Sequence, residues 1–240
     1  MAGFFGFFDY TKDGPEIKKD APPKPRIIVF FEILKRKFWT LCRLNLLYLV
    51  FSIPSLLIAL YVSDFFLYRY TPEEIANVFL YNLVYKATFA IFLISMSVVA
   101  IGPVQAGFTY ILRNFAREEH AFLWWDFKDT AKRNWKQSTI VCIIDLIVTL
   151  ILAFDVTMYS VMDMPSTVMS FGTGFVIVIF ILYLMMHLYI YPMLITFDLN
   201  IRQIYKNALI FAIIKFIPNL GIILLCLLTT VATTYLLFSV

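Results

Sequence analysis

The strongest constraint on this chain is a set of long apolar stretches. Residues 173–197 contain no Asp, Glu, Lys or Arg, and neither do residues 219–238. A helix of about 20 apolar residues crosses the roughly 30 Å hydrocarbon core of a bilayer. Hydrophobic residues make up 61% of the 240 residues and charged residues 15%, which is more apolar surface than a soluble fold can bury. The sequence therefore predicts an all-α integral membrane protein.

We expect a five-helix transmembrane bundle with interfacial amphipathic helices. The spans are placed at about 38–61, 87–112, 139–162, 173–197 and 219–238. Pro54 should kink the first span, and Gly102-Pro103 should kink the second. We expect the second span to be the last part of one unbroken helix that runs from Pro72 to about Leu112. Residues 201–217 carry apolar side chains at helical spacing, and Pro218 should break this stretch. Residues 1–25, an aromatic segment and a Pro/Lys-rich linker, precede the bundle of 26–240.

The basic residues predict the orientation of the bundle. With the N-terminus inside, only Arg69 and Lys86 of the 20 Lys and Arg fall on the outer side. Basic residues collect on the cytoplasmic side of membrane proteins. We therefore expect an N-in, C-out topology in which residues 113–138 form a cytoplasmic loop, with membrane lipids as partners.

The sequence lacks the familiar signatures of catalysis and cofactor binding. It contains no G-x-x-x-x-G-K-[ST] and no G-x-G-x-x-G, which argues against direct nucleotide binding. It also lacks the G-x-S-x-G motif that carries the nucleophilic serine of α/β-hydrolases. Cys42, Cys142 and Cys226 are far apart in apolar runs, and the chain has two His. These counts indicate no metal site and no disulfide framework. We expect neither enzyme activity nor a cofactor, and we assign the net charge of +4 to topology and not to nucleic acid.

Several short motifs carry a family resemblance. They are Gly3-Phe-Phe-Gly-Phe-Phe-Asp9, Ile101-Gly-Pro-Val-Gln-Ala-Gly107, Tyr110-Ile-Leu-Arg-Asn114, Trp125-Asp-Phe127, Asn134-Trp-Lys-Gln-Ser138, Tyr191-Pro192, Phe197-Asp-Leu-Asn-Ile-Arg202 and Lys206-Asn-Ala-Leu209. Together they resemble the YesL-like membrane proteins of Firmicutes, the domain of unknown function 624. The resemblance implies a multi-pass protein of the bacterial cytoplasmic membrane. It also implies association with carbohydrate ABC importers, beside whose genes such proteins tend to be encoded.

The loop 113–138 is the first candidate for function. Aromatic and charged residues occur together in it, as they do at binding hot spots. The candidate docking residues are Glu118, Glu119, Trp124, Trp125, Asp126, Phe127 and Trp135. We expect at least one helix within 118–135, lying along the cytoplasmic face and contacting either another subunit or the lipid headgroups. The loop lacks the Gly that follows Glu-Ala-Ala in ABC permeases, so direct coupling to an ATPase is not expected.

Polar and flexible positions inside the spans form a second group of candidates. Asp145, Asp155 and His187 are intramembrane groups, which are costly unless they are paired. Asp145 and His187 could pair, either as structural glue or as a relay for protons or substrate, and we expect Asp145 to avoid lipid. Gly102, Pro103 and Gly107 indicate close helix packing or a hinge.

Three functions remain open from the sequence. The first is a non-catalytic accessory subunit of a carbohydrate ABC importer, with the permease subunits as its partners, which rests mainly on the resemblance. The second is a self-contained carrier that uses Asp145, Asp155 or His187, although no internal repeat supports it. The third is a membrane scaffold or sensor that acts through the aromatic loop.

Overall fold

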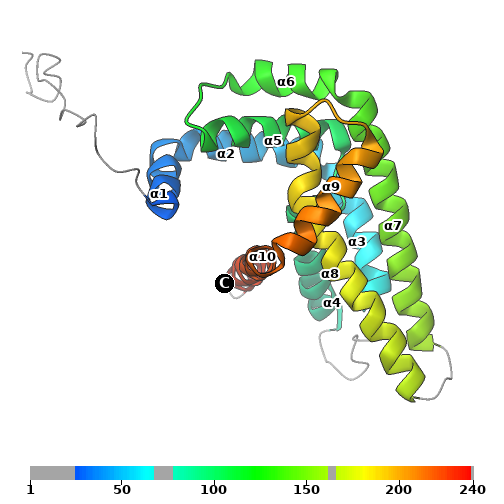
Figure 1. The fold of residues 1–240 in the computed structure, drawn as a ribbon. Helices are drawn as coiled ribbons and strands as arrows, with labels where there is room; N and C mark the ends of the chain where they lie inside the picture. Colours follow the sequence, from blue (N-terminus) through cyan, green and yellow to red (C-terminus); the bar gives the residue numbers. More distant parts are fainter. Residues whose placement is uncertain (1–24, 68–77, 162–165, 239–240) are drawn as a thin grey trace, which may run out of the picture. The chain divides into compact units, whose positions relative to one another are not determined.

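The computed structural model describes residues 25–67, 78–161 and 166–238, and the regular structure in these residues is helical. The chain divides into one unit that ends at Phe38 and a second that begins at Trp39. The described helices are α1 (Arg26–Arg36), α2 (Phe38–Phe51), α3 (Ile53–Leu67), α4 (Val78–Ser95), α5 (Gly102–Ala116), α6 (Leu123–Arg133), α7 (Trp135–Val161), α8 (Ser166–Thr196), α9 (Ile201–Ile214) and α10 (Phe216–Phe238) (Figure 1). The predicted all-α class is confirmed, and the aromatic segment at 1–24 lies outside the described residues.

The first unit contributes α1. Its apolar side chains Ile27, Phe30 and Phe31 are exposed, and Lys35 and Arg36 occupy its last turn. Basic residues at a helix C-terminus complement its partial negative charge. An exposed apolar face with a basic end is typical of a helix at a membrane interface.

Three described helices are long and apolar enough to cross a membrane: α7, α8 and α10. The pair α2 and α3 forms a fourth candidate if the two helices count as one broken span, bent by 68°. Ser52 separates this pair, and Pro54 stands in the first turn of α3, where proline is well tolerated. The predicted bend near Pro54 is confirmed, and the structure supports three or four spans.

The prediction of one unbroken helix up to Leu112 is wrong. α4 ends at Ser95 and α5 begins at Gly102, so the span predicted at 87–112 is divided by a non-helical segment. Ser97 in this segment has a φ of 60°, a left-handed conformation that costs energy for a residue other than glycine. Pro103 occupies the first turn of α5, so Gly102-Pro103 starts a helix instead of kinking one.

The C-terminal third holds α8, α9 and α10. Asn200 begins α9 with a capping box, because its side chain accepts from the Gln203 backbone while the Gln203 side chain accepts from Asn200. The break predicted at Pro218 occurs earlier, at Lys215, and Pro218 lies in the first turn of α10. Proline fits there because the first backbone N–H groups of a helix need no partner within it.

Two groups of buried apolar side chains hold the second unit together. The larger lies among α3, α4, α7, α8 and α10 and includes Ala59, Leu93, Leu152, Met185 and Ile223. The smaller joins α5, α7, α8 and α9 through Ala106, Val141, Ile190 and Ile204. In Figure 1, α3, α7 and α8 run beside one another, and α6 crosses the end at which α7 begins. The region predicted as a loop, 113–138, therefore holds the end of α5, all of α6 and the start of α7.

Candidate functional site

The helix α6 packs on α5 through one face and leaves its opposite face open. Phe127 is only 4% exposed, and its backbone and ring lie against Gly107 of α5. Trp125 precedes Phe127 by two positions, about 200° around the helix, and is 69% exposed. Phe122, Trp124 and Trp135 are also exposed. We call Phe122, Trp124, Trp125 and Trp135 the aromatic surface.

The structure divides the residues predicted for docking into two groups. Trp124, Trp125 and Trp135 belong to the aromatic surface, whereas Phe127 is part of the packing beneath it. The Asp126 carboxylate accepts the Phe122 backbone N–H at 2.7 Å and so satisfies the start of α6. Glu118 and Glu119 follow α5 in an exposed turn, where Glu118 has a φ of 60°. Of the predicted docking residues, the three tryptophans thus present the largest exposed side chains.

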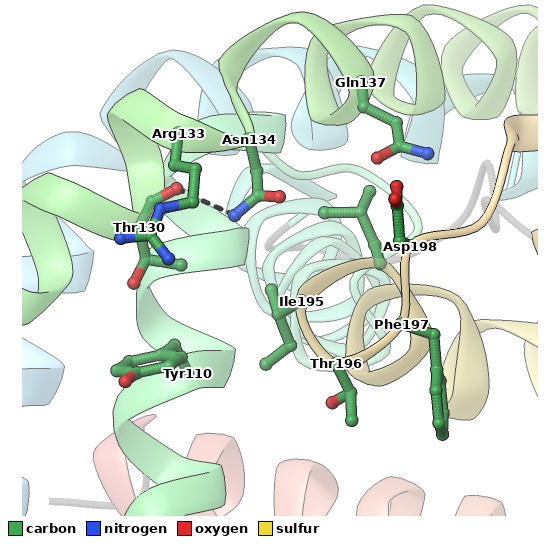
Figure 2. Close-up of a pocket in the computed structure, with 10 residues that line it drawn as sticks. Tyr110, Thr130, Arg133, Asn134, Gln137, Ile195, Thr196, Phe197 and Asp198 are labelled. Carbon is green, nitrogen blue, oxygen red and sulfur yellow. Dashed lines mark hydrogen bonds between the residues drawn. The ribbon is translucent and has the colours of Figure 1, made fainter.

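A polar pocket of about 410 Å³ lies beside α6 (Figure 2). Its lining comes from α5, α6, the start of α7 and the end of α8 with the following turn: Tyr110, Thr130, Arg133, Asn134, Gln137, Leu194, Ile195, Thr196, Phe197 and Asp198. Asn134 donates to the Thr130 carbonyl at 3.0 Å, and Gln137 donates to the Leu199 carbonyl at 2.6 Å. These bonds fix two amide side chains at the junction of three helices.

Arg113 supports one wall of this polar pocket. Its guanidinium donates to the Thr196 hydroxyl at 3.2 Å and lies 5.1 Å from the centre of the Tyr110 ring. Its Nε is buried and has no hydrogen-bond partner in the part of the chain that the structure describes. Sequence reasoning did not single out Arg113, Arg133 or Asp198 as site residues. The motifs at 110–114, 134–138 and 197–202 could have pointed to this pocket, because residues from all three line it.

A second polar cluster is buried among the spanning helices. Asp145 of α7 is 1% exposed, and its Oδ1 accepts the Tyr183 hydroxyl at 2.8 Å and the Tyr205 hydroxyl at 2.6 Å. His187 Nε2 lies 3.3 Å from the same Oδ1. The expected burial and hydrogen bonding of Asp145 are confirmed, and we call Asp145, Tyr183, His187 and Tyr205 the Asp145 cluster. Asp155 lies ten residues further along α7 and is not part of it.

The geometry of the Asp145 cluster shows how the His187 ring is held. His187 Nδ1 is 2.9 Å from the Tyr183 carbonyl oxygen, which only accepts, so the hydrogen bond between them places a proton on Nδ1. Among the described residues, His187 Nε2, Asp145 Oδ2 and the buried Tyr191 hydroxyl have no hydrogen-bond partner, so the cluster retains unused polar capacity.

Tyr205 reaches the cluster from α9, which is not among the candidate spans. Burial raises the pKa of the Tyr205 phenol above its usual range, and the neighbouring Asp145 carboxylate raises it further. The phenol therefore keeps the proton that it donates. The hydrogen bond from Tyr205 to Asp145 holds α9 against α7. No pattern in the sequence predicted this contact.

The glycines singled out in the sequence lie at close helix contacts. A Cβ at Gly102 would lie 1.9 Å from the Ser138 carbonyl oxygen of α7, and one at Gly107 would lie 2.7 Å from the Phe127 carbonyl oxygen of α6. Both positions require the smallest residue, because the obstacle is backbone. Pro103, next to Gly102, starts α5.

The chain matches a known family over part of its length. The family described as protein of unknown function, DUF624, matches residues 41–156, which run from α2 into α7 and include the aromatic surface and Asp145. No curated protein and no solved structure matches the chain.

Proposed function

We propose that this chain, which belongs to the DUF624 family, is a non-catalytic accessory membrane subunit that docks another membrane protein through α6. The observation that carries the proposal is the exposed aromatic surface, formed by Trp124 and Trp125 of α6 and by Phe122 and Trp135 at its two ends. Large aromatic side chains are enriched at the centres of protein interfaces. Packed on α5 through Phe127, α6 already has its inner apolar face covered, so Trp125 on the outer face needs a different partner.

The polar pocket supports the same proposal. Thr130 and Arg133 of α6 line it, so it adjoins the helix that bears the aromatic surface. Arg133 is paired with Asp129 at 3.1 Å, whereas the amides of Asn134 and Gln137 are held by backbone carbonyls. An apolar anchor beside a polar recess is the usual anatomy of an interface. The family resemblance suggests a permease subunit of a carbohydrate ABC importer as the partner.

We further propose an N-in, C-out topology with five crossings. The crossings are the broken pair α2–α3, then α4, α7, α8 and α10. α4 has 18 residues and a length of about 27 Å, close to the thickness of a bilayer core. Arg69 and Lys86 are then the outer basic residues, and Lys86 forms an ion pair with Asp64 of α3. This topology places α6 on the cytoplasmic side of the bacterial membrane.

Replacing the central tryptophans tests docking. The double variant Trp124→Ala/Trp125→Ala should release a co-purifying permease subunit in mild detergent. Truncating such anchors costs about 2 kcal/mol or more, a loss of roughly thirtyfold in affinity. The matched control is Phe171→Ala/Phe175→Ala, which removes two exposed aromatic side chains from the spanning helix α8. Retention of every partner at wild-type level in the tryptophan variant would refute docking and leave a lipid-headgroup role for the aromatic surface.

The Asp145 cluster favours a second function, that of a carrier. A buried His–Asp pair with an unused carboxylate oxygen is suited to receive a proton or a polar substrate group. The test is proton uptake by liposomes that contain the wild type or Asp145→Asn. Uptake by the wild type alone would favour a carrier, and equal behaviour would leave the cluster a structural link.

A further inference from the structure

A cavity of about 620 Å³ lies where two helix breaks meet in the second unit. One break, at Ser52, separates α2 from α3, and the other, at residues 96–101, separates α4 from α5. Ser52 and Ser97 both line the cavity. Broken helices that face one another in a membrane protein commonly surround a ligand, because their freed backbone groups must lie in protein or in a cavity.

The floor of this cavity is polar and built around Gln105. The Gln105 amide is buried, donates to the Ser97 hydroxyl at 2.7 Å and accepts from the Tyr48 hydroxyl at 2.7 Å. It thereby links the last turn of α2 to the break between α4 and α5, where Ser97 has its left-handed conformation. Ser52 is 5% exposed, and its hydroxyl lies beside the Tyr48 phenol, whose proton goes to Gln105; among the described residues this hydroxyl makes no hydrogen bond of good geometry. Such a buried hydroxyl can bond a ligand without losing a well-formed internal hydrogen bond.

The walls of the cavity are apolar. They consist of Leu49, Ile53, Leu56, Ile91, Ile94 and Phe108. Leu49 and Ile53 are 62% and 53% exposed on the outer surface of helices proposed to lie in the membrane, so the cavity opens toward acyl chains. Of the residues that line it, none is Asp, Glu, Lys, Arg or His. A charged head would be desolvated there without a counter-ion, which is costly.

We propose that this cavity, the break pocket, binds an uncharged glycerolipid. The hydroxyl head lies on Ser52, Ser97 and Gln105, and the acyl chain lies between Leu49, Leu56 and Phe108. The volume is within the range of about 300–1,000 Å³ that is usual for small-molecule sites, and such sites combine apolar walls with a few convergent polar groups. This inference is independent of the docking role proposed for α6.

The test uses a photoreactive, clickable monoacylglycerol with the full-length protein in nanodiscs. Labelling followed by peptide mapping should place the probe on α2–α5. A photoreactive fatty acid of the same chain length, carrying a carboxylate, should label these helices much less. Ser52→Ala removes one hydrogen bond, worth about 1 kcal/mol, and should reduce specific labelling about fivefold without loss of fold. Leu56→Trp should abolish labelling by filling the cavity.

A matched control comes from another groove of the molecule. Phe65, Leu150, Ile151 and Phe154 line an apolar groove of about 330 Å³ that lacks a polar floor. Ile151→Trp fills that groove and should leave labelling at the wild-type level. The proposal fails if the fatty acid labels α2–α5 as strongly as the monoacylglycerol. It also fails if the label maps elsewhere, or if Ser52→Ala, checked by its unfolding temperature, labels like the wild type.

Discussion

Gly102 offers the sharpest test of how the helices fit together. Its missing side chain lets the start of α5 lie directly on α7, where a Cβ would come within 1.9 Å of the Ser138 carbonyl oxygen and 2.4 Å of its carbonyl carbon. An ordinary van der Waals contact begins at 3.4 Å, so Gly102→Ala would force the backbones of α5 and α7 apart by about 1.5 Å. Neither backbone can rotate away as a side chain could.

The magnitude follows from two opposing effects. Overpacking usually costs about 1–3 kcal/mol, and the better helix propensity of Ala returns up to about 1 kcal/mol. The upper end of the cost applies because the obstacle is helical backbone. We therefore expect Gly102→Ala to destabilise the protein by about 2 kcal/mol.

Thermal unfolding in detergent, followed by tryptophan fluorescence, measures this effect. Gly174→Ala and Gly221→Ala are the controls, because a Cβ at either position meets no described atom within 4 Å outside its own stretch of helix. These variants should match the wild type or exceed it by up to about 1 kcal/mol. If Gly102→Ala unfolds at the same temperature as Gly221→Ala, the close approach of α5 and α7 is incorrect.

Three further predictions concern packing, hydrogen bonding and topology. In chemical unfolding, Phe127→Ala should lower the free energy of unfolding by about 3–5 kcal/mol, whereas Trp125→Ala should change it by less than about 0.5 kcal/mol. Equal losses would contradict the division of α6 into a buried and an exposed face. Tyr205→Phe removes a donor from a carboxylate and should cost about 1.5–3 kcal/mol, against about 1 kcal/mol for Tyr189→Phe, whose partner is the neutral Asn219 amide. A cysteine at position 166 should react with an impermeant reagent from outside, and one at position 128 only from inside; the reverse pattern would refute N-in, C-out.

The sequence indicated the helical membrane class and several local features, because these depend on short-range patterns. Long apolar runs predicted α7, α8 and α10, although the run of α7 contains Asp145 and Asp155, and the mixture of aromatic and charged residues predicted a helix within 118–135. The cost of a buried carboxylate pointed to Asp145 and suggested His187 as its partner, and the two lie 3.3 Å apart.

The missed features depend on contacts between distant segments. Gly102-Pro103 fits both a kinked helix and a helix start, and the packing of Gly102 on Ser138 accompanies the second outcome. Tyr183 precedes His187 by one helical turn, so its place on the same face could have been read from spacing. Tyr205 lies 60 residues from Asp145, and no local pattern links them. The polar pocket draws on similarly separated segments.

The convergence of three helices on one oxygen atom has a mechanical consequence. Asp145 belongs to α7, and its Oδ1 accepts from Tyr183 of α8 and from Tyr205 of α9. This atom therefore ties α9, which is not among the candidate spans, to two helices that are. A ligand or substitution that separates Tyr205 from Oδ1 would loosen α9 while leaving the link between α7 and α8 in place.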